Sequence, residues 1–380
     1  MSSHCREYGL AVLLLAVFFC VSSQAAEETV TIGLVAPLTG DQAYIGTGVL
    51  QGVQMAVEDA NIKGPVFDGV KLKLVALDDQ HNPTQAVLAA NKLIADPNVL
   101  GVVGHFNSSC TKAASAIYHE SRMAQITPAS TNPEISRQGF DTFFRVCATD
   151  DVQAPTAANF VWSNRGVKKI AIIDDQTTYG KGLADEFEKK FKGLGGTVLS
   201  REGITQGEKD FTPLLTKIKA IGPELIYYGG VYPELALLLK QSKKIGLDAP
   251  WMGGDGIFDV TLIQLVSPEF AEGTYATMLG VDPHSLDSAK DFVARYEARY
   301  GEIGSFSAYA YDAANVLIEA IRRAAKKDRE SVLKEVRNTK DFPGILGALN
   351  FDEKGDAVGK SIGIFKVESG KFKFLEEVKP

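Results

Sequence analysis

Cysteine is scarce in this sequence, and the scarcity limits how the fold can be held together. Only four of the 380 residues are cysteines, and Cys5 and Cys20 fall within the first 20 positions. The remaining pair, Cys110 and Cys147, cannot form a disulfide framework, so a large apolar core must stabilise the chain. We expect both to be buried thiols, with a disulfide between them as the alternative.

Positive charge is also in short supply. The chain has 40 Lys and Arg residues against 47 Asp and Glu residues, which gives a formal charge of −7. Nucleic-acid binding requires a basic surface, so we expect no nucleic-acid partner. Apolar residues make up 45% and charged residues 23%, levels that are typical of a globular protein and that exclude extensive disorder.

The usual signatures of catalysis and cofactor binding are missing. No G-x-S-x-G nucleophile motif occurs, and Gly46-Thr47-Gly48 is followed by Gly52, the wrong spacing for a dinucleotide-binding loop. The histidines after the N-terminal region are too scattered for a metal motif: His81, His105, His119 and His284. We therefore predict no enzymatic activity, no cofactor and no metal.

The one long apolar run, Leu10–Val21, is too short to span a bilayer as a helix, which takes about 20 residues. It follows Arg6 and precedes small residues, a layout typical of a secretory signal peptide over residues 1–26, with Ser23-Gln24-Ala25 as the cleavage site. An uncleaved anchor and a lipoprotein signal at Cys20 are the alternatives. Bulky Phe18-Phe19 disfavours the lipoprotein signal.

Beyond this segment, short β-branched runs alternate with helical patterns in two series. Such alternation is typical of parallel sheets covered by helices on both faces. In the first series we expect strands at 30–36, 70–77, 100–103, 125–127 and 142–146, with helices at 48–60, 83–95 and 108–120. In the second we expect strands at 169–174, 197–204, 225–228 and 250–252, with helices at 155–163, 179–193, 211–221 and 234–245.

The C-terminal part has too few elements for a third sheet. We expect helices at 288–300, 307–325 and 330–338, and strands at 349–351 and 362–368. The chain would then cross back to complete both lobes. The predicted fold is α/β: two Rossmann-like lobes with parallel central sheets joined by hinge strands. Residues 27–148 plus 278–354 would form lobe 1, and residues 149–277 plus 355–380 lobe 2. Ligands of such sheets bind at the carboxyl ends of the strands, here in a cleft between the lobes.

A hydroxyl-rich loop leads into the helix predicted at 108–120. The helix start offers free N–H groups and a favourable dipole for an anion, and we expect Ser108 or Ser109 to cap it. His105 in the same loop fits a structural histidine better than a ligand-binding one. The strand ending at Thr127-Pro128 leaves carbonyl groups at the same sheet edge, where an ammonium group would fit. Asp255 lies on a glycine-rich turn, where an acid is more often solvated than functional.

The chain resembles the periplasmic binding proteins of branched-chain amino acid ABC transporters, of the leucine/isoleucine/valine-binding type. The resemblance covers nearly all of the chain after the signal peptide, and the order and spacing of its blocks make it specific. The blocks are Ile32–Gly40, Asp78-Asp79, Val103–His105, Ile126–Ala129, Asp174–Gly180, Gly207–Phe211, Tyr227–Gly230 and Phe351–Asp356.

The resemblance implies a type I fold that closes on a free amino acid and delivers it to membrane permease subunits from the periplasm. Ser108 and the Thr131 N–H would hold the ligand α-carboxylate. The Ala129 carbonyl and the Thr131 hydroxyl would take the α-ammonium, with Asp255 as its counter-charge. The remaining residues expected around the ligand are Ser130, Tyr179, Val231, Tyr44 and Ile45.

The sequence departs from the family pattern at several of these positions. Asp255 stands where the family often has glutamate, and Val231 stands at a position that is commonly aromatic. The aromatic residue of the first loop is Tyr44 or is replaced by Ile45. These changes leave open a carrier for aromatic amino acids or small amides. A sensory ligand-binding module is a further alternative.

Overall fold

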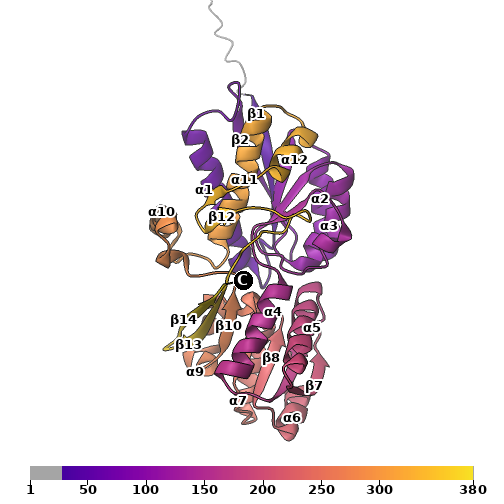
Figure 1. The fold of residues 1–380 in the computed structure, drawn as a ribbon, viewed down its shortest axis with the longest axis vertical. Helices are drawn as coiled ribbons and strands as arrows, with labels where there is room; N and C mark the ends of the chain where they lie inside the picture. The colour runs from indigo at the N-terminus through magenta and orange to yellow at the C-terminus, as the bar shows by residue number, and fades with distance from the viewer. Residues whose placement is uncertain (1–27, 380) are drawn as a thin grey trace, which may run out of the picture.

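The computed structural model describes residues 28–379, which form two α/β lobes built on separate sheets (Figure 1). The first sheet has five parallel strands in the order β2-β1-β3-β4-β5. They are β1 (Thr29–Ala36), β2 (Lys71–Asp78), β3 (Val99–Gly104), β4 (Ala124–Thr127) and β5 (Phe143–Arg145). The signal peptide predicted at 1–26 lies outside the described residues.

Helices cover both faces of the first sheet because its inner strands are apolar on both sides. On one face α1 (Ala43–Ile62) packs along α11 (Ser307–Ala324), and Leu34 of β1 joins their apolar cluster. On the other face α2 (Pro83–Ile94) and α3 (Ser108–Glu120) pack with Val35. Helices α10 (Lys290–Tyr300) and α12 (Arg329–Arg337) belong to the same lobe in Figure 1.

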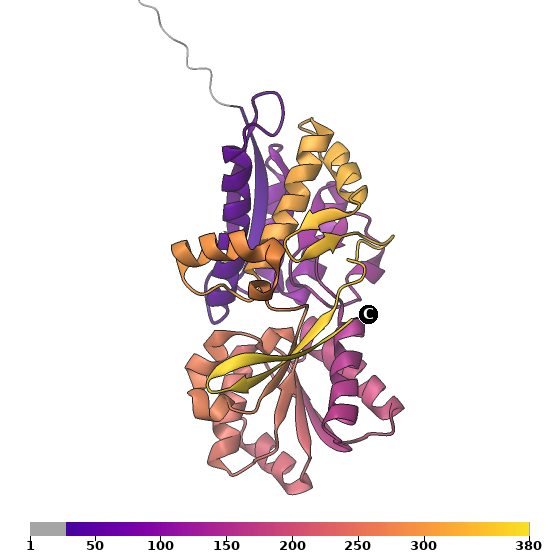
Figure 2. The same ribbon diagram turned by 60° about the vertical axis from the view of Figure 1, so that its left-hand side comes forward.

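The second sheet has the strand order β14-β13-β10-β9-β8-β6-β7. The five strands β10, β9, β8, β6 and β7 run parallel to one another. The C-terminal hairpin β13-β14 adds two antiparallel strands at the edge next to β10 (Figure 2). The strands are β6 (Lys169–Asp174), β7 (Thr197–Gly203), β8 (Leu225–Gly229), β9 (Trp251–Gly253), β10 (Tyr275–Met278), β13 (Ile362–Glu368) and β14 (Lys371–Val378).

Two helix layers enclose this second sheet. Helices α4 (Asp150–Asn159) and α5 (Thr178–Gly193) share one apolar cluster with β6 and β8. Apolar residues of α6 (Thr212–Ile221), α7 (Tyr232–Lys244) and α8 (Val260–Val266) pack on the opposite face, and the short α9 (Pro268–Ala271) follows α8.

Within residues 28–379 the chain passes between the lobes three times. The connections run from β5 to α4, from β10 to α10, and from β12 (Gly347–Leu349) to β13. Each lobe is therefore assembled from segments that are far apart in sequence. The predicted fold class, two Rossmann-like lobes with parallel central sheets, is confirmed.

Several element boundaries differ from the sequence predictions. Helix α4 begins at Asp150, not at Pro155, which lies inside the helix. Helix α1 starts at Ala43 and not at the predicted residue 48, because Gly46 lies inside the helix and does not break it. Glycine is needed at position 46, because a Cβ there would lie 1.9 Å from the carbonyl oxygen of Pro37. The strand predicted at 349–351 is replaced by a small hairpin of β11 (Phe342–Gly344) and β12. Strands β10 and β14 were not predicted.

The remaining structural expectations concern thiols, metals and membranes. Cys110 and Cys147 are free and buried, as predicted, so the alternative of a disulfide is wrong. Across residues 28–379 no group of His, Cys, Asp and Glu side chains is arranged to hold a metal ion. None of the helices described here has both the length and the hydropathy needed to cross a membrane.

Candidate functional site

The carboxyl ends of β3 and β4 form one side of the space between the lobes. Ser108 begins α3 and is buried, and its Oγ lies 3.4 Å from the backbone nitrogen of Asn132, which donates to it. The expected cap by Ser108 or Ser109 is wrong. Asn107 holds the N-cap position, and its side chain is drawn away because Nδ2 donates to Gln42 Oε1 at 2.8 Å. The first turn of α3 therefore has no side-chain cap.

The turn after β4 is held in place by hydroxyl groups. Thr127 Oγ1 donates to the His105 carbonyl at 2.7 Å and accepts the Ser130 N–H at 2.9 Å. Ser130 Oγ donates to the Phe106 carbonyl at 2.9 Å, so this side chain shapes the turn. Thr131 is fully buried, and its hydroxyl has no well-formed hydrogen bond among the described residues. A buried hydroxyl whose hydrogen bonding is incomplete is costly unless something else pairs with it.

Asp255 lies on the other side of the space, in a single 3₁₀ turn over Asp255–Ile257. Its side chain is buried, so the solvated alternative is wrong. Oδ1 accepts from Tyr179 Oη at 2.9 Å and from Gln153 Nε2 at 2.8 Å, while Tyr179 Oη accepts the Gly256 N–H. Burial raises the pKa of Asp255 to about 6.

A second buried acid, Asp150, was missed by the sequence analysis. It is the first residue of α4, and Gln153 Nε2 lies 3.4 Å from its Oδ1. Burial and the nearby Asp255 raise the pKa of Asp150 well above its ordinary value. The Thr131 hydroxyl and the Arg145 charge act in the opposite direction and offset part of this rise. The Asp-x-x-Gln spacing places Asp150 and Gln153 on one helical face. It went unnoticed because the helix was expected to begin later.

Neither acid is paired with a protein cation. Among the described residues no Lys, Arg or His forms a salt bridge with Asp150 or Asp255, whereas the buried Asp79 pairs with His105. His105 Nδ1 lies 2.8 Å from Asp79 Oδ2 and its Nε2 lies 3.2 Å from Tyr118 Oη. The structural role predicted for His105 is confirmed. Two buried carboxyl groups without a counter-ion favour a positively charged ligand between the lobes.

Direct hydrogen bonds join the two lobes. The Thr178 N–H donates to Ser109 Oγ at 3.1 Å, and Asn132 Nδ2 donates to the Thr178 carbonyl at 2.6 Å. Tyr232 Oη donates to the Asp41 carbonyl at 2.7 Å. The structure is therefore a closed form in which both sides of the site are withdrawn from solvent.

Comparison with known proteins identifies the family to which this two-lobed chain belongs. Residues 29–371 match the profile of the family described as "Periplasmic binding protein". The chain belongs to the periplasmic binding protein family. It is 35% identical over 369 residues to "Leu/Ile/Val-binding protein homolog 1" of Brucella suis biovar 1 (strain 1330), covering 96% of this chain and 98% of that protein.

Other relatives agree with this placement. A "leucine-, isoleucine-, valine-, threonine-, and alanine-binding protein" of Pseudomonas aeruginosa is 37% identical, covering 90% of this chain and 91% of that one. The leucine binding protein LivK of Thermotoga maritima superposes with a TM-score of 0.86 at 35% identity, covering 92% and 99%. LivJ of Streptococcus pneumoniae, solved with isoleucine, gives 0.86 at 29% identity, covering 93% and 100%.

The other residues expected at the site of this periplasmic binding protein lie in different surroundings. Ala129 is buried in the turn after β4, and Ile45 is buried in the apolar cluster of lobe 1. Val231 occupies the N-cap position of α7 without a side-chain hydrogen bond and packs in the cluster that includes Tyr179. Tyr44 is 41% exposed and lines a cavity of about 240 Å³ together with Asp259.

Proposed function

We propose that this periplasmic binding protein is the substrate-binding component of an ABC importer and captures a free aliphatic amino acid between its lobes. The observation that carries the proposal is the opposition of charges across the closed space. Free N–H groups at the start of α3 face it from lobe 1, and two buried carboxyl groups without a cation face it from lobe 2. An α-amino acid carries both complementary charges.

The carboxylate end of the ligand would lie on lobe 1. Ser108 Oγ and the Thr131 N–H would donate to it, supported by the dipole of α3. The Ser108 hydroxyl suits this role because its present contact with Asn132 is long, at 3.4 Å.

The ammonium end would lie toward lobe 2. Asp255 would supply the counter-charge, and Tyr179 and Gln153 hold its Oδ1 in place. The Ala129 carbonyl and the Thr131 hydroxyl would accept the remaining N–H groups. Asp150, beside Asp255, adds a second negative group to the same region.

The side chain would pack among apolar residues near Val231 and Ile45. The relatives named for leucine, isoleucine and valine support a branched-chain ligand. Val231 is smaller than an aromatic residue, and this favours phenylalanine as a second candidate ligand. Direct competition between leucine and phenylalanine decides between them.

Hinge closure around the ligand would couple capture to delivery. Lobe 1 would comprise 27–148 and 278–354, and lobe 2 would comprise 149–277 and 355–380, in line with the three connections. The closed form would dock on permease subunits in the membrane, without chemical change to the ligand. Residues 1–26 would direct export to the periplasm and be cleaved, without a lipid anchor.

A thermal-shift panel with the twenty amino acids tests the proposal. We expect leucine, isoleucine or valine to raise the melting temperature in a concentration-dependent way, and isothermal titration calorimetry to give one site per chain. Ligand recovered unchanged by mass spectrometry is the expected control against catalysis. A flat response to the whole panel would refute the proposed ligand class.

A further inference from the structure

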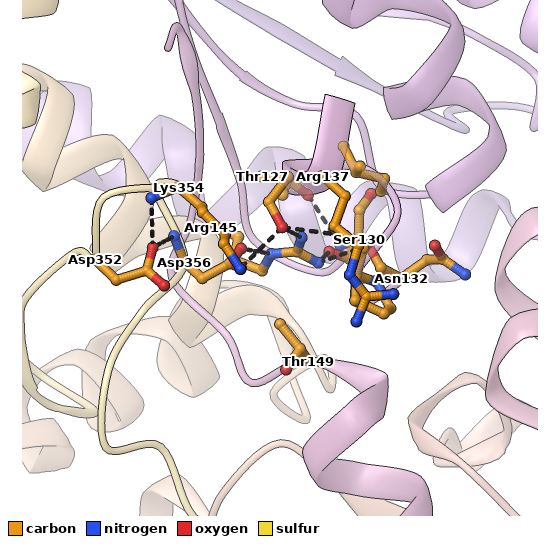
Figure 3. Close-up of polar contacts among 12 residues, drawn as sticks. Thr127, Ser130, Asn132, Arg137, Arg145, Thr149, Asp352, Lys354 and Asp356 are labelled. Atoms are coloured by element: carbon orange, nitrogen blue, oxygen red, sulfur yellow. Dashed lines mark hydrogen bonds and ion pairs between the residues drawn. The ribbon is translucent and has the colours of Figure 1, made fainter. Parts of the chain in front are cut away.

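Arg145, the last residue of β5, is completely buried beneath the candidate site. Its guanidinium group makes four hydrogen bonds. Nη1 donates to the carbonyls of Ser130 (2.8 Å) and Asn132 (3.0 Å), Nη2 donates to Ser136 Oγ (3.0 Å), and Nε donates to Asp356 Oδ1 (2.5 Å). Figure 3 shows the guanidinium group between the Asp352–Asp356 turn and the Ser130–Asn132 segment. Few side chains other than arginine can bridge so many acceptors at once.

The two carbonyl groups that Arg145 binds flank Thr131. In a trans peptide the N–H points opposite to the carbonyl of the preceding residue. Because the Ser130 carbonyl points at Arg145, the Thr131 N–H points away from Arg145. The Thr131 carbonyl is held from another direction, since it accepts the Asp150 N–H at 3.0 Å. Both peptide groups of Thr131 are thereby fixed in orientation.

The counter-ion of Arg145 comes from the third connection between the lobes. Asp356 lies between β12 and β13, and its carboxylate also accepts from Ser136 Oγ at 2.8 Å. The Arg145 N–H donates to the Gly355 carbonyl at 2.9 Å. Gly355 has a φ of +84°, and a Cβ there would lie 2.0 Å from the Phe143 carbonyl oxygen, so this close approach requires glycine. One buried side chain thus ties the Thr131 segment to an interlobe connection.

We propose that Arg145 is a positioning residue for ligand binding: it sets the orientation of the peptide group between Ser130 and Thr131 and links that orientation to the third interlobe connection. This inference rests on the proposed function, because it assumes that the Thr131 N–H and hydroxyl bind the amino acid. Arg145 acts through Thr131 and does not itself contact the ligand.

The test compares Arg145→Lys with a matched control. Lysine keeps the charge but lacks the fork that reaches two carbonyls and Asp356 together. Arg329 is the control because it also binds backbone carbonyls, those of Ile94, Asp96 and Val99, at the start of β3, whereas the site lies at the carboxyl end of that strand. Leucine affinity is measured by calorimetry and the melting temperature of the ligand-free protein by scanning calorimetry.

We expect Arg145→Lys to weaken leucine binding about tenfold, while Arg329→Lys lowers the melting temperature without changing the affinity. Asp356→Asn, which keeps Arg145 but removes its counter-charge, is expected to weaken binding in the same direction. In a double-mutant cycle, Arg145→Lys and Thr131→Val should be non-additive, because the Thr131 hydroxyl is already misplaced when Arg145 is changed.

Two results would overturn the inference while leaving the proposed function intact. One is an unchanged leucine affinity in both Arg145→Lys and Asp356→Asn. The other is strict additivity of Arg145→Lys with Thr131→Val. A wild-type protein that binds no amino acid would instead overturn the proposed function, and the inference with it.

Discussion

Asp150 and Asp255 share the side-chain amide of one residue, Gln153, whose Nε2 lies 3.4 Å from Asp150 Oδ1 and 2.8 Å from Asp255 Oδ1. Neutral donors such as Gln153, together with Tyr179 at Asp255, do not supply the positive charge that two buried acids require. The ligand ammonium is the group that would complete this arrangement. The pair therefore links ligand affinity to protein stability and to pH.

Asp255→Asn should separate affinity from stability. The amide oxygen that replaces Oδ1 can still accept from Tyr179 and Gln153, but the counter-charge for the ammonium is lost. We expect leucine affinity to fall by roughly 2 kcal/mol or more, because a buried ammonium is left unpaired. The ligand-free protein should become more stable at pH 7.5, because a buried charge is removed. Calorimetric titration and denaturant unfolding check the two effects.

Leucine affinity should depend on pH through Asp255. Burial raises its pKa to about 6, and a bound ammonium stabilises the carboxylate form and lowers that pKa. Below about pH 6 binding must release a proton, so the affinity should fall, by at most about tenfold per pH unit for one group. Above pH 7 this dependence should be flat.

The stability of the ligand-free protein should change with pH in the opposite sense. The folded state holds the Asp255 proton more tightly than the unfolded state does. The contribution of this group is therefore fully present below about pH 4 and is lost as the pH rises through about 6. Asp312→Asn, which removes a buried acid of similar pKa on α11, should leave the pH dependence of affinity unchanged. If leucine affinity still fell below about pH 6 in Asp255→Asn, the pH dependence could not be assigned to Asp255.

Ser108→Ala removes the only side-chain hydroxyl expected to donate to the ligand carboxylate from the first turn of α3. We expect leucine affinity to fall by roughly 2 kcal/mol, since the buried carboxylate loses a charged hydrogen bond. Ser115→Ala is a control on the same helix, where a buried hydroxyl donates to the Lys112 carbonyl. Equal affinities of the two variants in calorimetry would show that Ser108 does not bind the ligand.

Asn132→Ala tests the contacts that close the lobes. Its Nδ2 donates across the interface to the Thr178 carbonyl at 2.6 Å. Losing this bond should reduce the closed population and speed ligand release, with about a three- to thirtyfold weaker affinity. Asn164→Ala, which removes an exposed bond to Glu376, is the matched control. Stopped-flow dissociation is the measurement, and equal release rates in the two variants would argue against this role.

Most strands and helices could be predicted from the alternation of apolar runs, and α3 and β6 begin and end where expected. The failures have local causes. The helix expected at 155–163 leaves out the residues of α4 that precede Pro155, and this hid Asp150. Strand β14 has mostly exposed residues and lies at the sheet edge, so it lacks a buried pattern. Arg145 could not be singled out, because its partner Asp356 lies more than 200 residues away.

The order in which the segments are synthesised has a consequence for how the chain folds. Strands β1 to β5 are complete by residue 145, yet α11, which covers one face of their sheet, begins only at Ser307. A growing chain therefore carries an apolar sheet face that is covered only by α1 until most of its length has been made. Lobe 1 can therefore complete its native core only after Ser307 and the residues that follow it have been made.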